Sequence, residues 1–109
     1  MTAYQLQDEV RAFRALADAT RRQILEDLRE GELAAGEIAG RFAMTAPSVS
    51  KHLRILREAE LISERREGNR ILYALCQERL ALCLGRFLSA VCPEQIVLRH
   101  TRWKEGEQP

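Results

Sequence analysis

Residues 44–56, MTAPSVSKHLRIL, constrain the fold of this chain more than any other segment. Placed on a helix at about 100° per residue, Val49, Leu53 and Leu56 gather on one side. The other side carries Ser50, Lys51, Arg54, Arg57 and Glu58. The segment therefore predicts an amphipathic helix that packs through its aliphatic side and exposes a hydroxyl and several cations.

The ends of this helix can also be predicted. Thr45 is a good N-cap, and Pro47 is tolerated in a first turn, where its missing N–H would have no helical partner. We expect the helix to end near Ala59. A short apolar helix over residues 35–42 precedes it, joined by "AMT", which predicts a helix–turn–helix. In that motif the second helix enters the major groove of DNA with its N-terminal residues at the base edges.

The segment after the helix changes period. In "LISERREGNRILYAL" two alternating runs flank Gly68 and Asn69, which predicts a β-hairpin. Arg65, Arg66 and Arg70 lie around its tip. Cations at the tip of a hairpin suit DNA phosphates or the minor groove.

Three further helices complete the predicted organisation. Apolar spacing predicts a first helix over 4–16, a second over 19–29 and a last one over 77–91. Asp18 is the expected N-cap of the second helix, Gly31 is expected to end it in the left-handed conformation, and Pro93 ends or restarts the last helix.

The predicted fold is therefore mainly α, a helix-turn-helix with a small β-hairpin wing. One domain is expected over residues 1–103, followed by a disordered tail over 104–109.

Charge is unevenly distributed along a nearly neutral chain. The net charge is +1, yet residues 41–72 hold seven basic and four acidic residues, and residues 41–57 hold no acid. A local cationic patch is typical of a nucleic-acid-binding surface. No apolar run approaches the roughly 20 residues of a membrane span, and the first residues lack the pattern of a signal peptide, so we expect a cytoplasmic protein.

Three stretches resemble the arsenic-repressor (ArsR/SmtB) family of winged-helix regulators. They are "ALADATRRQILEDL", "GEIAGRFAMTAPSVSKHLRILREAELI" and "REGNRILYAL", and the "SVSKHLRIL" core is highly specific. The resemblance implies a homodimeric repressor of its own or a neighbouring operon, which binds a roughly palindromic double-stranded DNA operator. It also implies that the first and last helices form the dimer interface. The chain departs from the family pattern at Ala19, usually Pro, and at Glu60, usually Gly, where a left-handed conformation costs on the order of 1 kcal/mol.

Two sets of site residues follow. The expected DNA contacts are Thr45, Ala46, Pro47, Ser48, Ser50, Lys51, His52, Arg54, Arg57, Arg65, Arg66, Asn69 and Arg70. The expected dimer contacts, more apolar surface than a small winged-helix core can cover, are Leu6, Val10, Phe13, Leu80, Leu84, Phe87 and Leu88.

The cysteines leave alternatives open. The metal-site motifs of the family are absent, and Cys76 and Cys83 lie about 10 Å apart along one helix, too far to share a metal within one subunit. Cys76, Cys83 and Cys92 are interpreted as packing residues, with a thiol-based redox or arsenite sensor as the alternative. No metal or cofactor is predicted, and no inducer is specified.

Two other functional classes fit the sequence less well than a DNA-binding regulator does. A winged-helix protein-interaction module without DNA binding would expose an apolar or acidic face, which the cations of residues 51–57 disfavour. An enzyme is not expected, because the chain has no paired carboxylates, nucleophile–base set or glycine-rich phosphate loop.

Overall fold

The computed structural model describes the backbone of residues 3–101 and the side chains of residues 6–101. Its helices and strands, in chain order, are α1 (Ala3–Leu16), α2 (Ala19–Asp27), a 3-10 turn (Leu28–Glu30), β1 (Leu33–Ala34), α3 (Ala35–Ala39), α4 (Ala46–Glu58), β2 (Ile62–Glu67), β3 (Arg70–Leu75), α5 (Gln77–Val91) and α6 (Glu94–Thr101). The predicted domain limit at residue 103 and the predicted tail lie outside the described residues.

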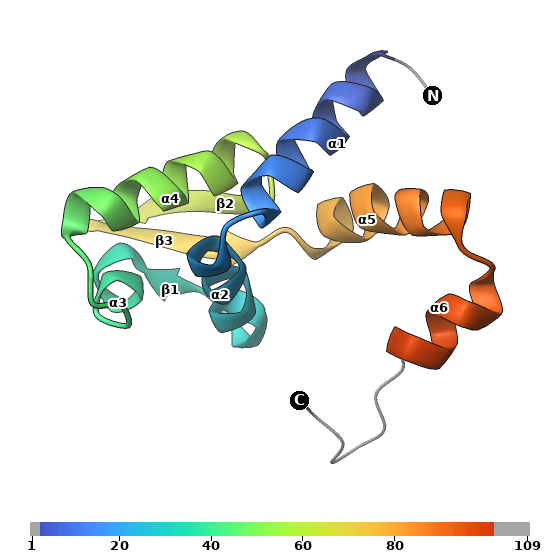
Figure 1. Ribbon diagram of the computed structural model, residues 1–109. Helices are drawn as coiled ribbons and strands as arrows, with labels where there is room; N and C mark the ends of the chain where they lie inside the picture. The colour runs from blue at the N-terminus through green and yellow to red at the C-terminus, as the bar shows by residue number, and fades with distance from the viewer. Residues whose placement is uncertain (1–2, 102–109) are drawn as a thin grey trace.

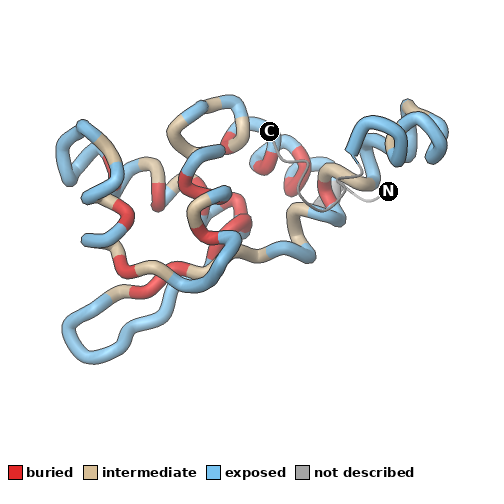
Figure 2. Tube along the Cα trace, turned by 90° about the horizontal axis from the view of Figure 1, so that it is seen from below, coloured by how far each residue is buried: buried red, intermediate tan, exposed pale blue. Residues whose placement is uncertain are grey.

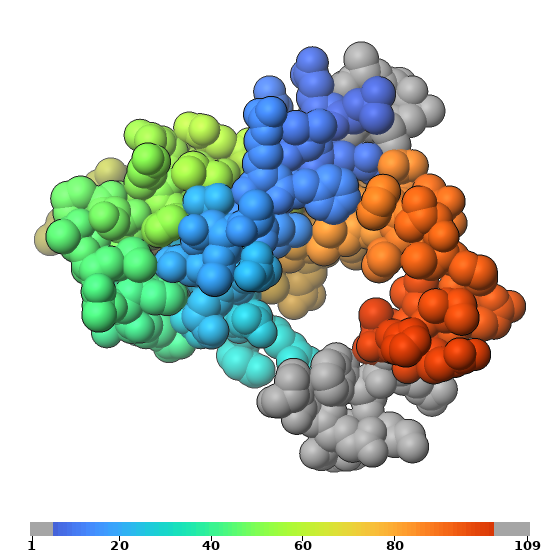
Figure 3. Space-filling model, in the orientation of Figure 1, coloured from blue at the N-terminus to red at the C-terminus, as the bar shows by residue number. Residues whose placement is uncertain are grey.

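The elements form a helical body with a small sheet and two projecting helices. The sheet is antiparallel in the order β1-β3-β2, and α4 packs against α1, α2, α3 and β2. In Figure 1 α4 runs above the hairpin, and α5 leads away from the body before α6 turns back. Figure 3 shows the same division, with α5 and α6 standing to one side of the blue-to-green body. None of the helices in residues 3–101 has the length and apolar character needed to cross a membrane.

Helix α4 begins as its sequence predicts. The hydroxyl of Thr45 accepts a hydrogen bond from the Ser48 N–H at 3.3 Å, and Pro47 occupies the first turn. Val49, Leu53 and Leu56 are buried, which confirms the predicted aliphatic side. Of the four N–H groups that a helix start leaves without a helical partner, the hydroxyl satisfies one and proline removes another.

The end of α4 is a Schellman motif. The N–H of Leu61 donates to the Leu56 carbonyl at 3.0 Å, and the N–H of Glu60 donates to the Arg57 carbonyl at 2.9 Å. Glu60 has φ 60, so it adopts the left-handed conformation whose cost was considered from the sequence. Leu56 and Leu61 are both fully buried, so the apolar contact that accompanies this motif is present.

The predicted hairpin is confirmed. Gly68 has φ 61, and among the described non-glycine residues only Glu60 has a positive φ, so the two-residue turn is of type II′. The turn places Glu64 opposite Tyr73. Residues 63–70 are all exposed, and they form the pale blue loop at the lower left of Figure 2.

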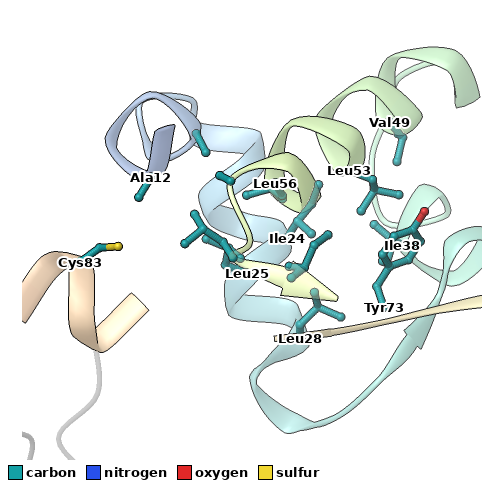
Figure 4. Close-up of a cluster of buried hydrophobic side chains, with 14 residues drawn as sticks. Ala12, Ile24, Leu25, Leu28, Ile38, Val49, Leu53, Leu56, Tyr73 and Cys83 are labelled. Carbon is teal, nitrogen blue, oxygen red and sulfur yellow. The ribbon is translucent and has the colours of Figure 1, made fainter. Parts of the chain in front are cut away.

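A single apolar core joins the helices to the sheet. Its largest fully buried side chains are Ile24, Leu28, Ile38, Leu56, Leu61, Ile62 and Val49. In Figure 4 Ile24 of α2, Ile38 of α3 and Leu56 of α4 point toward one another, and Cys83 of α5 lies at the edge with its sulfur directed toward the cluster. Helix α5 thus touches the core chiefly through its first half, because Leu80 and Cys83 pack there while residues 86–91 are exposed.

Two predicted helix ends and the predicted conformation of one glycine were wrong in detail. Helix α2 ends at Asp27 and tightens into a 3-10 turn, because the last turn of a helix often adopts i to i+3 bonds. Helix α3 ends at Ala39, and the N–H groups of Arg41 and Phe42 also bond three residues back. Gly31 has φ 146 and ψ 179, an extended conformation that essentially only glycine adopts. It differs from the left-handed helical conformation that was predicted.

One strand was not predicted, and one helix decides between the two outcomes predicted at Pro93. Strand β1 has only two residues, too few to show an alternating pattern, and it is held by pairing with Leu72 and Tyr73. Helix α6 follows Pro93, whose carbonyl accepts from the N–H of Ile96 and of Val97, so the proline restarts a helix.

Candidate nucleic-acid interface

The exposed side of α4 presents the predicted residues to solvent. Ser50, Lys51, Arg54 and Arg57 are all exposed. Within residues 6–101 Lys51 makes no ion pair, and Arg54 has only Glu58 at 3.9 Å, with both side chains more than half exposed. A pair this long and this exposed contributes little, so both cations are available to an anionic ligand.

A groove runs between α4 and the wing. It has a volume of about 390 Å³ and is lined by Pro47, Ser50, Lys51, Arg54, Arg57, Glu64 and Tyr73. The structure therefore brings the central part of the predicted helix face into one concave surface with the cross-strand pair Glu64 and Tyr73 of the hairpin. Hydroxyl, ammonium and guanidinium donors on one such surface can bind phosphate oxygens or the acceptor edge of guanine.

Two residues of this groove, Glu64 and Tyr73, were missed by the sequence analysis. Arg57 donates to Glu64 at 2.7 Å, and Glu64 also hydrogen-bonds the Tyr73 hydroxyl. Burial, together with the nearby Glu64 carboxylate, raises the pKa of Tyr73. The predicted two-residue turn fixes the cross-strand pairing of Glu64 with Tyr73, so this contact could have been found from the sequence. Arg57 is consequently held against the wing.

The start of α4 is small and accessible. Thr45, Ala46, Pro47 and Ser48 are all exposed, and none has a long side chain. A helix N-terminus carries partial positive charge, and small residues let an anion approach its N–H groups. This end of the helix suits close contact with a DNA strand.

The wing cations differ in how they are paired. Arg65 binds both carboxylate oxygens of Glu32, at 2.8 and 2.9 Å, and also binds Glu67 at 2.9 Å. The Arg65 hydrogen bond lowers the pKa of Glu32. Arg70 reaches Glu37 at 3.3 Å, whereas Arg66 makes no ion pair within residues 6–101. Arg66 is thus the most available cation of the wing, and Asn69 in the turn is exposed as well.

His52 lies away from the exposed face. Its Nδ1 is 3.2 Å from Nη1 of Arg21 and 3.8 Å from the Asp18 carboxylate. Arg21 also donates to the carbonyls of Ala15 and Arg14, at 2.7 and 3.1 Å, and so caps the end of α1. The imidazole thereby joins α4 to α2 and α1, and its predicted DNA contact stays a prediction.

The expected dimer residues form an apolar face on α1 and α5. Leu6 is 54% exposed, Val10 46% and Phe87 44%, while Leu80 and Leu84 are half-buried. Beside this face Asp8 and Glu9 of α1 are buried against Arg79 and Arg86 of α5. The Glu9 hydrogen bond raises the pKa of Arg86. The two helices are therefore joined by charge-assisted bonds and leave their large apolar side chains uncovered.

The cysteines are free thiols in different environments. Cys83 is buried, whereas Cys76 and Cys92 are half-buried. Burial raises the pKa of Cys83 and outweighs the opposing effect of Arg79, so the thiol stays protonated near neutral pH. Within residues 6–101 no group of three His, Cys, Asp or Glu side chains is placed to hold a metal ion.

The chain is similar to known bacterial regulators. The family model described as "Bacterial regulatory protein, arsR family" matches residues 18–64. The transcriptional repressor SdpR of Bacillus subtilis is 49% identical over 63 residues, which is 58% of this chain and 70% of SdpR. The HTH-type transcriptional regulator KmtR of Mycobacterium tuberculosis is 46% identical over 100 residues, 91% of this chain and 77% of KmtR.

A solved structure shares the same fold. The solution structure of the homodimeric winged helix-turn-helix DNA-binding domain of a possible ArsR-family regulator from Mycobacterium bovis superimposes with a TM-score of 0.68. It is 29% identical, and the match covers 94% of this chain and 93% of that domain. The likeness extends beyond residues 18–64 to the helices on either side.

Proposed function

Because the chain belongs to the arsR family of bacterial regulatory proteins and is a DNA-binding transcriptional regulator, we propose that it acts as a homodimeric repressor. Each subunit places the N-terminal half of α4 in the major groove of one half of a roughly palindromic operator. The operator lies in front of its own or a neighbouring operon, and the protein acts in the cytoplasm, where that DNA is.

The exposed face of α4 is the observation that carries this proposal. Lys51 and Arg54 point into solvent beside the groove and are not neutralised by strong ion pairs. Either side chain reaches the O6 and N7 acceptors of guanine when the helix lies in a major groove. Ser50 adds a hydroxyl that can donate or accept on the same face.

The wing and the start of α4 fix the position of the protein on the duplex. Arg66 and Asn69 at the hairpin tip contact the sugar–phosphate backbone, and Arg70 joins them when its 3.3 Å contact with Glu37 opens. Arg65 is already bound by two carboxylates, so it orders the wing and contributes less to phosphate binding. Phosphate contacts of this kind add affinity for all sequences alike.

Dimerisation supplies the second half of the recognition surface. The apolar face of α1 and α5 is what a second copy would cover, and the similar domain from Mycobacterium bovis is homodimeric. Two-fold pairing would set the recognition helices about 34 Å apart, which is one turn of DNA.

Footprinting on the DNA upstream of the protein's own reading frame tests this function. We expect two protected segments about one helical turn apart and a dimer in sedimentation velocity at the same protein concentration. Protection of one unpaired segment would contradict the dimeric mode. Absence of protection anywhere in that DNA, with binding no tighter than to random sequence, would contradict repression of a local operon.

A further inference from the structure

The recognition helix α4 ends at a residue type that its backbone does not favour. Glu60 has φ 60, a conformation that glycine adopts without strain and that other L residues adopt at a cost in free energy. Nothing in the backbone hydrogen bonding of the Schellman motif requires a side chain there. The presence of a glutamate at this position must therefore be explained by the contacts of its carboxylate.

That contact is with Arg79 of α5. Nη2 of Arg79 lies 2.6 Å from Oε2 of Glu60, and Nη1 lies 3.0 Å from Oδ2 of Asp8 on α1. The Arg79 side chain is only 23% exposed and that of Asp8 9%. One largely buried guanidinium thus joins α1 and α5, the proposed dimer helices, to the end of α4, the proposed DNA-binding helix.

The backbone brings the same segments together. The carbonyl of Leu61, next to Glu60, accepts from the N–H of Cys76 at 2.9 Å, and Cys76 is the N-cap of α5. This bond fixes the distance between the end of α4 and the start of α5. It continues the β2–β3 ladder, in which Ile62 pairs with Leu75. The Glu60–Arg79 pair lies outside that backbone ladder and is a second link, made by side chains, between the end of α4 and α5.

We propose that Glu60 and Arg79 are positioning residues that set the angle between the recognition helix and the dimer helices α1 and α5. In a symmetric dimer this angle is applied twice, once in each subunit. It therefore determines the distance between the two recognition helices and the half-site spacing that the dimer accepts. This inference rests on the proposed homodimeric binding mode, and it assigns the spacing preference to one ion pair.

The chain offers a matched control. Glu9 of α1 pairs with Arg86 of α5, so it joins the same two dimer helices through the same chemistry. Among the described residues no hydrogen bond or ion pair joins that pair to α4 or to Glu60. Substitution of Glu9 loosens α1 against α5 and leaves the link to the recognition helix in place.

The experiment compares Glu60→Gln and Glu9→Gln in the full chain. The probes are a palindromic duplex that the wild type selects from a random-sequence library and its derivatives with one base pair added or removed at the centre. Dissociation constants are measured by fluorescence anisotropy at a concentration where sedimentation shows a dimer. We expect Glu60→Gln to reduce the wild-type preference for the selected spacing about two- to fivefold, because a partly exposed charged pair is worth that much. Glu9→Gln should keep the wild-type preference.

A second variant separates positioning from stability. Glu60→Gly removes the carboxylate and also relieves the left-handed backbone, so its melting temperature should equal or exceed that of Glu60→Gln. Its spacing preference should nevertheless fall as much as that of Glu60→Gln. If Glu60→Gly melts no lower than Glu60→Gln and still loses its preference for the selected spacing, a purely structural role of the pair cannot explain that loss.

Two results would overturn the inference. The pair is not the positioning device if both Glu60 variants keep the wild-type spacing preference, or if they lose affinity equally on every duplex. Either result would leave the proposed dimeric repressor intact. A wild-type protein that selects no palindrome, or tolerates every spacing equally, overturns this inference together with the proposed binding mode.

Discussion

Phe13 of α1 and Phe87 of α5 meet edge to face, with ring centroids 5.5 Å apart and an interplanar angle of 73°. Both rings still expose more than a third of their surface, 36% and 44%. Aromatic rings that are this open, beside the exposed Leu6 and Val10, are the kind of anchor that a protein interface buries. The pair thus helps to join the two helices within a subunit and lies at the centre of the face that we assign to the partner.

Replacement of Phe87 by Glu tests that assignment. A carboxylate at the centre of an apolar interface is desolvated without a partner, so we expect monomers at micromolar concentration and weak operator binding. Sedimentation velocity and anisotropy measure the two effects. Phe87→Leu keeps the apolar character and should remain dimeric. A wild type that sediments as a monomer, or a Phe87→Glu variant that sediments as a dimer, would refute this interface.

Lys51→Ala and Arg54→Ala should weaken operator binding without unfolding the protein. Both side chains are exposed, and a good base contact contributes about 1–3 kcal/mol to discrimination. The measurement is operator affinity at physiological salt, with melting temperature recorded in parallel. Arg29→Ala, an exposed cation outside the groove, is the control. Unchanged affinity in both α4 variants is incompatible with α4 as the reading helix.

The wing cations should differ in their effect on salt dependence. Arg66→Ala removes a cation that has no ion pair within residues 6–101, so we expect lower affinity for all DNA sequences. The slope of the logarithm of the binding constant against the logarithm of the salt concentration should become shallower by about 1. Arg65→Ala removes a guanidinium that Glu32 and Glu67 already neutralise, and its effect on the slope should be smaller. Titrations of specific and random duplexes over a salt series measure both. A loss confined to one base position would show that the wing reads sequence.

Replacing Cys76, Cys83 and Cys92 by Ala or Ser should leave operator affinity nearly unchanged. Stability should fall by about 1 kcal/mol, because Cys83 packs into the edge of the core. Its raised pKa keeps that thiol protonated, so Cys83 should also be alkylated more slowly than Cys76 or Cys92. The decisive comparison is operator release by peroxide, polysulfide or arsenite in the wild type and the triple variant. Release from the wild type alone would make the protein a thiol sensor.

Asp18 gives a prediction for pH dependence. Its carboxylate accepts from the Arg21 N–H at 3.1 Å, and this bond, with the nearby His52 and Arg21, lowers its pKa below the ordinary 3.8. An acid with a lowered native pKa stabilises the fold fully above its ordinary pKa, and the contribution is lost as pH falls through the native value.

Asp18→Ala should accordingly lower the free energy of unfolding by about 1 kcal/mol near pH 7, and the difference from wild type should close below about pH 4. Urea denaturation across a pH series measures this difference. Asp18→Asn retains an N-cap at every pH, so its stability should show no matching acid transition. A difference that persists undiminished at pH 2 would show that Asp18 acts through something other than its charged form.

Local chemistry made much of this structure predictable. The caps Thr45 and Asp18, the buried side of α4 and the Gly68–Asn69 turn all depend on residues within a few positions of one another. The left-handed Glu60 could also be anticipated, because the position follows from where α4 must end. The exposed cations of α4 followed from helical geometry alone.

The contacts that were not predicted span long stretches of sequence. Arg79 meets Asp8 across 71 residues, and Arg65 meets Glu32 across 33, and no periodic pattern encodes which acid a given arginine will reach. His52 lies close enough to the helix edge that only the packing of α2 decides which way its ring turns. Tertiary packing therefore determined which cations of the candidate site are neutralised and which are available.

The sheet order β1-β3-β2 leaves β2 with an unpaired outer edge, since β3 is covered on both sides. Open edges of this kind invite another chain to add a strand, the first step of aggregation. Four of the six residues of β2, Glu64, Arg65, Arg66 and Glu67, are charged. An incoming strand would have to desolvate that row of ions. The charges that we assign to phosphate binding at the wing thereby also disfavour addition of another strand at this edge of the sheet.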